Sequence, residues 1–234
     1  MSRLYLYGVT RPREVEERLA EQGIFLIAAE DCAAIVSDLD EGPVEATRRN
    51  LLAHADVVEQ LHVEAVVLPA RFGHVLESGE EAFELLALPE IEQLLERHET
   101  TCELTLKGTY EESVLAEVGA ELGPLRAAYR AEPSVDAGIA LGEAVGEGLS
   151  ERRAHDASLV LEGLGPLIID LVSSGPSGEL AAFDFALLAD RDSVEAIAAR
   201  LEELAARLSP PLHFKLVGPL PPYSFVHLTS PAVA

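Results

Sequence analysis

The chain lacks tryptophan and has little cysteine, lysine or methionine: its 234 residues include two cysteines, two lysines and one methionine. Cys32 and Cys102 lie far apart and share no CxxC spacing, which excludes a zinc site or a disulfide framework built from them. We expect both to be small apolar side chains in or near strands. No apolar run approaches the ~20 residues of a membrane span, and Met1–Arg3 leads into a strand-like run, not a signal peptide. The composition therefore favours a cytoplasmic protein.

Positive charge is also scarce. The chain has 41 acidic and 17 basic residues, a net charge of −24. The excess is spread evenly over both halves, so it forms an acidic coat and not an acidic tail. A nucleic-acid-binding protein needs a basic face to replace counterions, and adsorption to anionic lipid needs the same. The charge thus argues against both classes of partner.

The first half of the chain predicts four strands and two helices. Continuous or β-rich apolar runs mark the strands, at 3–9, 24–29, 32–37 and 65–68. Apolar residues at three-and-four spacing, with caps and breakers at the ends, mark helices at 10–22 and 44–61. The order β-α-β-β-α-β is the ferredoxin-like pattern, an antiparallel sheet with both helices on one face. A further helical stretch, kinked at Pro89, is expected over 80–97.

The second half repeats this order. Strands are expected at 101–109, 167–173, 180–188 and 212–217. Helices are expected at 110–122, 133–164 and 190–208, with a break at Gly123–Pro124 and a turn over 125–131. The long helix is an insertion in the first crossover. We therefore predict an α/β protein of the α+β type with two ferredoxin-like domains, residues 1–98 and 99–234.

A proline-rich strap, residues 216–226, follows the last strand. Three of the four residues 219–222 are proline, so the strap cannot be helical and should be stiff and extended. A second strand-like run follows it at 224–228. We expect the strap to return from the second domain to the first and to shape a cleft between them. Its effect on partner binding would then be indirect, unless Tyr223 and Phe225 are exposed and away from both cores.

Catalytic, metal and cofactor patterns are absent from the sequence. The seven histidines show no ligand spacing. His155, Asp156 and Ser158 have the letters of a catalytic triad, but they are neighbours on a predicted helix without the glycines of a nucleophile elbow. The glycine-rich stretches 163–166 and 173–178 match neither phosphate-binding pattern. We expect no enzyme activity, no cofactor and no metal.

Arg71 lies among apolar residues in the stretch Leu68–Gly73. If it is buried, it must be paired with a carboxylate. Alternatively, Arg71 and Phe72 contact a partner, because arginine and aromatic residues are common interface hot spots.

Three stretches together resemble the gas vesicle protein F/L family: LYLYGV at 4–9, LPARFG at 68–73 and GPLPPYSFV at 218–226. The strand CELTLK at 102–107 is also similar. Leu220 departs from the tryptophan usual in the family, and His74 from a frequent threonine. The motif residues that the resemblance marks as partner or interdomain contacts are Tyr5, Tyr7, Gly8, Leu68, Pro69, Arg71, Phe72, Gly73, Gly218, Pro219, Pro221, Pro222, Tyr223 and Phe225.

The resemblance implies two modified ferredoxin-like domains and an accessory role in gas vesicle formation. It implies a minor structural component or chaperone-like assembly factor, located in gas vesicles and cytoplasm. The implied partners are the small hydrophobic shell protein of the vesicle wall and other accessory proteins. A soluble acidic partner could cover the apolar shell protein and keep it dispersed. The covering surface would be an apolar cleft between the domains or an open sheet edge.

Two other functions stay open at this point. Tandem ferredoxin-like domains often bind small molecules between them, so a ligand-sensing module is an alternative. A hydrolase would need a carboxylate or histidine cluster with a shifted pKa in a cleft, and the sequence singles out no such pair.

Overall fold

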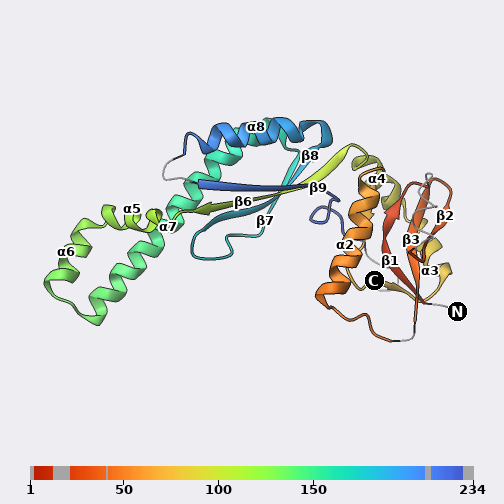
Figure 1. The fold of residues 1–234 in the computed structure, drawn as a ribbon, viewed down its shortest axis with the longest axis horizontal. Helices are drawn as coiled ribbons and strands as arrows, with labels where there is room; N and C mark the ends of the chain where they lie inside the picture. Colours follow the sequence, from red (N-terminus) through yellow and green to blue (C-terminus); the bar gives the residue numbers. More distant parts are fainter. Residues whose placement is uncertain (1–2, 13–21, 41, 209–211, 229–234) are drawn as a thin grey trace. The chain divides into compact units, whose positions relative to one another are not determined.

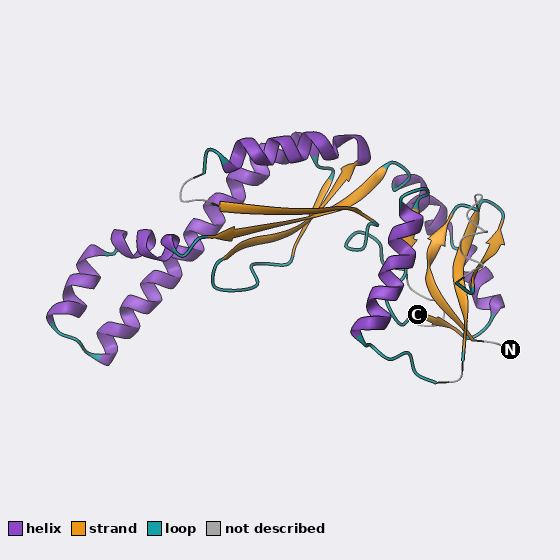
Figure 2. Ribbon diagram, viewed as in Figure 1, coloured by secondary structure: helices purple, strands orange, loops and turns teal. Residues whose placement is uncertain are grey.

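The computed structural model describes residues 3–12, 22–40, 42–208 and 212–228 (Figures 1 and 2). The chain divides into two compact units, residues 1–103 with 218–234, and residues 104–217. Each unit is built on its own sheet. Among the described residues, no helix combines the length and the apolar character needed to cross a membrane.

The sheet of the first unit has the strand order β2-β3-β1-β4, with antiparallel neighbours. Its strands are β1 (Arg3–Thr10), β2 (Ile24–Ala29), β3 (Cys32–Leu39) and β4 (Val67–Pro69). These are the four predicted strands, and a fifth, β5 (Val75–Leu76), pairs with β1 without having been predicted. Pro69 is tolerated at the end of β4 because β4 is an outer strand. Most of the helix predicted over 10–22 lies outside the described residues.

A β-bulge in β1 sets the positions of the N-terminal motif. Leu6 faces Val36 on β3 and Gly8 faces Ile35, so Tyr7 is an extra residue on β1. Gly8 pairs with Pro69 on its other side. A Cβ atom at Gly8 would lie 2.5 Å from the carbonyl oxygen of Leu68. The close approach of β1 and β4 therefore requires glycine at this position.

Helices cover both faces of this sheet. Along the strands, alternate residues point to opposite faces, so Ile35 and Val67 pack with α2 (Arg48–His62). Leu6 and Leu68 pack in a separate core with α3 (Gly79–Leu86) and α4 (Pro89–Arg97). The predicted kink at Pro89 is a break between two helices, with the proline in the first turn of α4.

The start of α2 differs from the prediction. The helix was expected from residue 44, but it begins after Thr47, whose side chain accepts a hydrogen bond from the N–H of Asn50. Leu51 and Leu52 were predicted on the core stripe of this helix. They are instead 44% and 52% exposed, because the apolar stripe extends past the end of the core.

The second unit has the strand order β7-β8-β6-β9. Its strands are β6 (Thr101–Tyr110), β7 (Asp170–Ser173), β8 (Ala181–Asp190) and β9 (Leu212–Leu220). Its helices are α5 (Ser113–Glu121), α6 (Gly123–Ala131), α7 (Val135–Leu164) and α8 (Val194–Ala205). The prediction of a turn over 125–131 is wrong: these residues belong to α6, and Pro124 lies in its first turn, where proline fits. In Figure 1, α5, α6 and the first part of α7 extend away from this sheet.

Asp156 is buried and joins α7 to the sheet. Its carboxylate accepts hydrogen bonds from the Tyr110 hydroxyl at 2.9 Å and from Nε of Arg152 at 2.8 Å. Burial and this bond to Asp156 raise the pKa of Tyr110. His155 next to it is exposed. Asp156 therefore connects α7 to β6.

The end of the chain turns where the sequence suggested a strand. β9 continues through Gly218 and the cis peptide bond to Pro219 as far as Leu220. Residues 224–228 were predicted as a strand, but the N–H groups of Phe225 and Val226 both donate to the carbonyl of Pro222 and close a turn. This turn places Val226 in the core that α3 and α4 cover.

Candidate functional site

A cleft of about 660 Å³ opens in the first unit, and it combines three separate stretches of the sequence. Part of its lining comes from α2 and the residues after β4, and the rest from the C-terminal segment. The lining residues are Leu51, His54, Ala55, Pro69, Ala70, Arg71, Phe72, Gly73, His74, Tyr223, Val226, His227 and Leu228.

The turn after β4 carries Arg71 and Phe72 into this lining. Ala70 donates its N–H to the carbonyl of Tyr7 at 2.9 Å, and His74 donates to the carbonyl of Arg71 at 3.1 Å. Gly73 closes the turn with a φ of 83°, a left-handed conformation that glycine adopts without a steric penalty. The backbone of this turn is therefore held at both ends.

His54 links β1, α2 and the turn after β4 through hydrogen bonds. Its Nε2 lies 3.2 Å from the carbonyl of Ala70, so this nitrogen carries the proton and donates. Nδ1 must then accept, and the Tyr5 hydroxyl donates to it at 2.8 Å. The Tyr5 oxygen in turn accepts the N–H of Gly73 at 3.2 Å. A continuous chain of hydrogen bonds thus joins β1, α2 and the turn.

Burial keeps both side chains of this network neutral. It lowers the pKa of His54, against the opposing effect of the bond to Ala70. Burial also raises the pKa of Tyr5 to about 12. A neutral histidine and a protonated tyrosine are the forms that the hydrogen bonds require.

Aromatic rings surround this network. Tyr5 meets Tyr7 edge to face with centroids 4.8 Å apart, and Tyr7 stacks on His54 at 5.6 Å. Phe72 contacts Tyr5 at 6.2 Å and His54 at 5.8 Å, both edge to face. Such pairs add stability beyond the area they bury. They hold Phe72 against the wall of the cleft.

Glu103 holds the C-terminal side of the cleft in place. The side chain is buried, and its oxygens accept the N–H of Ser224 at 2.6 Å and the Ser224 hydroxyl at 2.9 Å. Burial raises the pKa of Glu103, and the two bonds to Ser224 oppose that rise. The hydroxyl of the neighbouring Tyr223 is buried and, within the described residues, has no hydrogen-bond partner. Burial raises the pKa of this hydroxyl.

The motif residues predicted from the sequence separate into two groups. Pro69, Arg71, Phe72, Gly73 and Tyr223 line the cleft. Tyr5 and Tyr7 contact the lining residue His54 from β1.

The other predicted residues support the site or lie apart from its lining. Gly8 and Leu68 form the contact between β1 and β4. Gly218 and Pro219 are exposed on β9, Pro221 and Pro222 are buried, and Phe225 is half-buried.

Sequence reasoning missed the contribution of α2. Leu51, His54 and Ala55 line the cleft, and the apolar spacing of this helix predicted only a core face. Beyond its first turn, α2 carries more apolar residues than one core-facing stripe needs. This excess was the signal in the sequence that could have indicated a second apolar surface on the helix. His74 also lines the cleft, at the position where the sequence departs from the family pattern.

Arg71 is exposed and forms no ion pair with any carboxylate in the described part of the chain. The structural ion pair considered from the sequence is therefore absent among these residues. Nor do three His, Cys, Asp or Glu side chains in the described ranges come together as ligands for a metal ion.

The comparisons with known proteins agree on one family. The family model described as "Gas vesicle synthesis protein GvpL/GvpF" matches residues 3–227. Gas vesicle protein F of Streptomyces sp. (strain CB03234) is 31% identical over 238 residues, covering 95% of this chain and 98% of the relative. Gas vesicle protein F of Dolichospermum flosaquae is 36% identical over 97 residues, or 39% of this chain and 40% of the relative.

Two crystal structures share the fold. GvpF from Anabaena sp. PCC7120 superposes with a TM-score of 0.84 at 21% identity, covering 98% of this chain and 100% of that one. GvpF from Microcystis aeruginosa gives 0.77 at 18% identity, with coverage of 96% and 99%.

Proposed function

This chain belongs to the GvpL/GvpF family of gas vesicle synthesis proteins, and we propose that it acts in gas vesicle formation by binding the small hydrophobic shell protein of the vesicle wall. It would do so as a minor structural component or assembly factor, without catalysis or a cofactor, in the cytoplasm and at the vesicle. Other accessory proteins of the vesicle are further proposed partners.

The observation that carries this proposal is the cleft of the first unit. The family motifs at 68–73 and 218–226 contribute to one lining, with the exposed Leu51 of α2 beside them. An apolar cleft presented on a rigid support is typical of surfaces that receive an apolar segment of a partner. The charge of −24 would keep the complex dispersed.

The finer description of the fold belongs to the same proposal. Both sheets place their first strand between the third and the fourth, as β3-β1-β4 and β8-β6-β9. This order supports two modified ferredoxin-like domains. We keep residues 1–98 and 99–234 as the proposed domains, with the end of the chain returning to the first.

Co-expression with the shell protein tests the proposal. Full-length protein carrying an affinity tag should retain the shell protein in the soluble fraction. Leu51→Asn and Phe72→Ala should reduce the retained amount about tenfold, as expected for apolar anchors at an interface. Val135→Asn is the matched control, since Val135 is 79% exposed and belongs to α7 of the second unit. A folded, soluble protein that retains no shell protein would argue against the proposal, and so would equal loss in the control.

A small-molecule-binding module is the second candidate, and the volume of the cleft favours it. Ligand sites commonly have ~300–1,000 Å³ and a few polar groups among apolar ones, and the cleft has about 660 Å³ with Arg71 and His74 in its lining. This function predicts that a metabolite raises the melting temperature of the wild type but not of Phe72→Ala. Screening charged and apolar metabolites by thermal shift separates the two candidates.

A further inference from the structure

The cleft differs in charge from the rest of the chain. The chain has 41 acidic residues among 234, yet no aspartate or glutamate lines the cleft. The charged or ionisable lining side chains are Arg71, His54, His74, His227 and Tyr223. Burial lowers the pKa of His54 and so favours its neutral form, and Arg71 is the permanent charge in this lining. A carboxylate that enters the cleft would meet this charge and no acidic side chain in the lining.

Arg71 also differs from Arg3 and Arg11 of the first unit, which have acidic partners. Arg3 pairs with Glu77 at 3.4 Å, and Arg11 pairs with Glu92 at 2.8 Å. Within the residues described, the guanidinium of Arg71 has neither an ion pair nor a hydrogen bond, although its backbone is held in the turn. Most of the N–H donors of the guanidinium are thus available to a partner. The turn that carries Arg71 is held rigidly by the His54 network.

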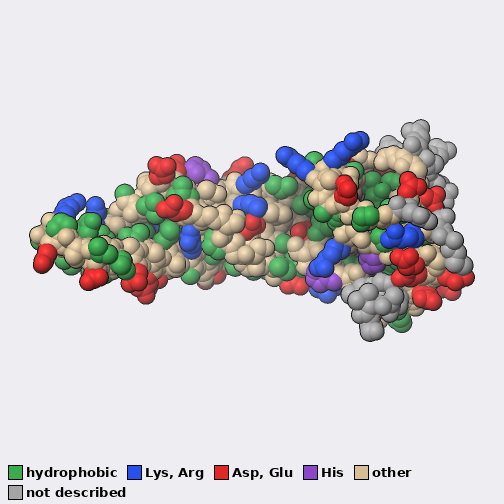
Figure 3. Space-filling model, turned by 90° about the horizontal axis from the view of Figure 1, so that it is seen from below, with side chains coloured by type: hydrophobic (Ala, Val, Ile, Leu, Met, Phe, Trp, Pro, Cys, Tyr) green, Lys and Arg blue, Asp and Glu red, His purple; other side chains and the backbone are tan. Residues whose placement is uncertain are grey.

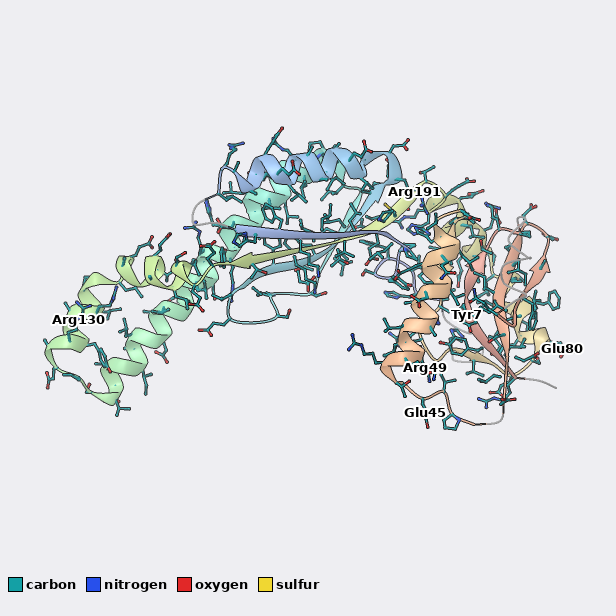
Figure 4. All side chains as sticks on the ribbon, in the orientation of Figure 1. Tyr7, Glu45, Arg49, Glu80, Arg130 and Arg191 are labelled. Carbon is teal, nitrogen blue, oxygen red and sulfur yellow. The ribbon has the colours of Figure 1, made fainter. Side chains whose placement is uncertain are left out.

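The first turn of α2 adds positive charge near this lining. Arg48 and Arg49 are its first residues, and the turn contains no acid; Figure 4 labels Arg49 there. Cations at a helix N-terminus oppose the helix dipole. The first turns of α3 and α4 carry two glutamates each, the favourable arrangement.

We infer that the cleft accepts an apolar peptide segment that carries a carboxylate side chain, and that Arg71 determines this specificity. The inference rests on the proposed function, because it assigns this segment to the shell protein. Leu51, Phe72 and Leu228 supply the apolar contacts. The planar guanidinium of Arg71 can bind both carboxylate oxygens, a geometry that lysine cannot reproduce. Burial of the pair by the apolar segment would strengthen it.

The test uses the full chain and three synthetic peptides. Each peptide is a capped amphipathic helix of leucine and alanine with one tryptophan, and the peptides differ only by Glu, Gln or Lys at one position of the apolar face. The protein contains no tryptophan, so selective excitation follows the peptide alone. We expect the Glu peptide to bind about tenfold more tightly than the Gln peptide and the Lys peptide to bind most weakly.

Arg71→Gln should abolish the preference for Glu over Gln while leaving binding of the Gln peptide within about twofold. Arg71→Lys should keep part of the preference for Glu that Arg71→Gln loses. Arg130→Gln is the control, because Arg130 is an exposed arginine of α6 in the second unit (Figure 4). The inference would be overturned by equal affinities for the three peptides, by no binding of any of them, or by a preference for Glu that survives Arg71→Gln. Each of these outcomes would count even if the shell protein is retained. A Glu preference that depends on Arg71, in a protein that does not retain the shell protein, would support the inference and refute the proposed function.

Discussion

His54 is a buried histidine whose two ring nitrogens both have partners, Ala70 and Tyr5. Because burial lowers its pKa below the ordinary 6.5, the folded state takes up a proton less readily than the unfolded state. The contribution of neutral His54 to stability is therefore fully present above pH 6.5. It is lost as the pH falls below 6.5 and through the lower pKa of the folded state.

The first prediction follows from the direction of this pKa shift. The free energy of unfolding of the wild type should fall between pH 7.5 and 5.5 by more than that of His54→Gln, since the variant lacks the titrating ring. Urea unfolding at the two pH values, followed by circular dichroism, measures the difference. His155→Gln, at an exposed histidine, should keep the wild-type pH dependence. Equal slopes for wild type and His54→Gln would show that His54 does not titrate as described.

The role of Gly8 is purely steric. A methyl group at this position would overlap the carbonyl oxygen of Leu68, which belongs to the backbone of β4 and cannot rotate away.

Gly8→Ala should therefore destabilise the protein by about 1–3 kcal/mol, the cost of overpacking in a core. Gly142→Ala serves as the comparison. It lies on α7 with nothing within 4 Å of a Cβ, and the helical preference of alanine should stabilise by ~0.5–1 kcal/mol. Urea midpoints measure both changes, and a neutral Gly8→Ala would mean that β1 and β4 can separate without cost.

At the scale of elements, the end of the chain is attached by a carboxylate at the beginning of β6. Glu103 accepts both the N–H and the hydroxyl of Ser224, and Val226 fills the core behind this attachment. The neighbouring residues Tyr223 and Val226–Leu228 form one side of the cleft. Detachment of this segment would remove that side.

Glu103→Ala should leave the Ser224 donors without their acceptor and cost about 1–3 kcal/mol. Protease cleavage within residues 221–228 should become faster, because the segment opens more often. Glu151→Ala, at an exposed position on α7, should change neither the urea midpoint nor the cleavage. If Glu103→Ala is cleaved no faster than the wild type, Val226 alone holds the segment.

At the scale of the whole molecule, the acidic coat decides solubility. Acidic side chains are spread over the face drawn in Figure 3, with hydrophobic side chains between them. At pH 7 the net charge of −24 makes copies of the chain repel one another. Near the isoelectric point of about 4.5 this repulsion disappears.

The protein should consequently stay dispersed at pH 7 and associate near pH 4.5 through its exposed apolar side chains. Light scattering across this pH range measures the association, and circular dichroism on the same samples separates it from acid unfolding. Equal scattering at both pH values, with the fold retained, would mean that charge does not keep the copies apart.

The sequence by itself determined the four main strands of each half and the helices α2, α5, α7 and α8, because hydrophobic spacing and breakers such as Pro89 act within a few residues. It also determined the family, because the motifs at 4–9, 68–73 and 218–226 are contiguous. Two errors, at 125–131 and 224–228, concern short stretches where proline can start a helix or a turn as readily as it ends an element. The sequence also missed the short strand β5 and placed the start of α2 too early.

Only the tertiary structure decided which of these motifs meet. His54 contacts Tyr5 and Ala70 because the strand order places β1 beside β4 under α2. Ser224 reaches Glu103 across 121 positions of the sequence. Such contacts depend on the path of the chain through space. The local spacing of hydrophobic residues carries no information about that path. The same path left Arg71 exposed in a lining without acids, and the proposed preference for a carboxylate rests on this arrangement.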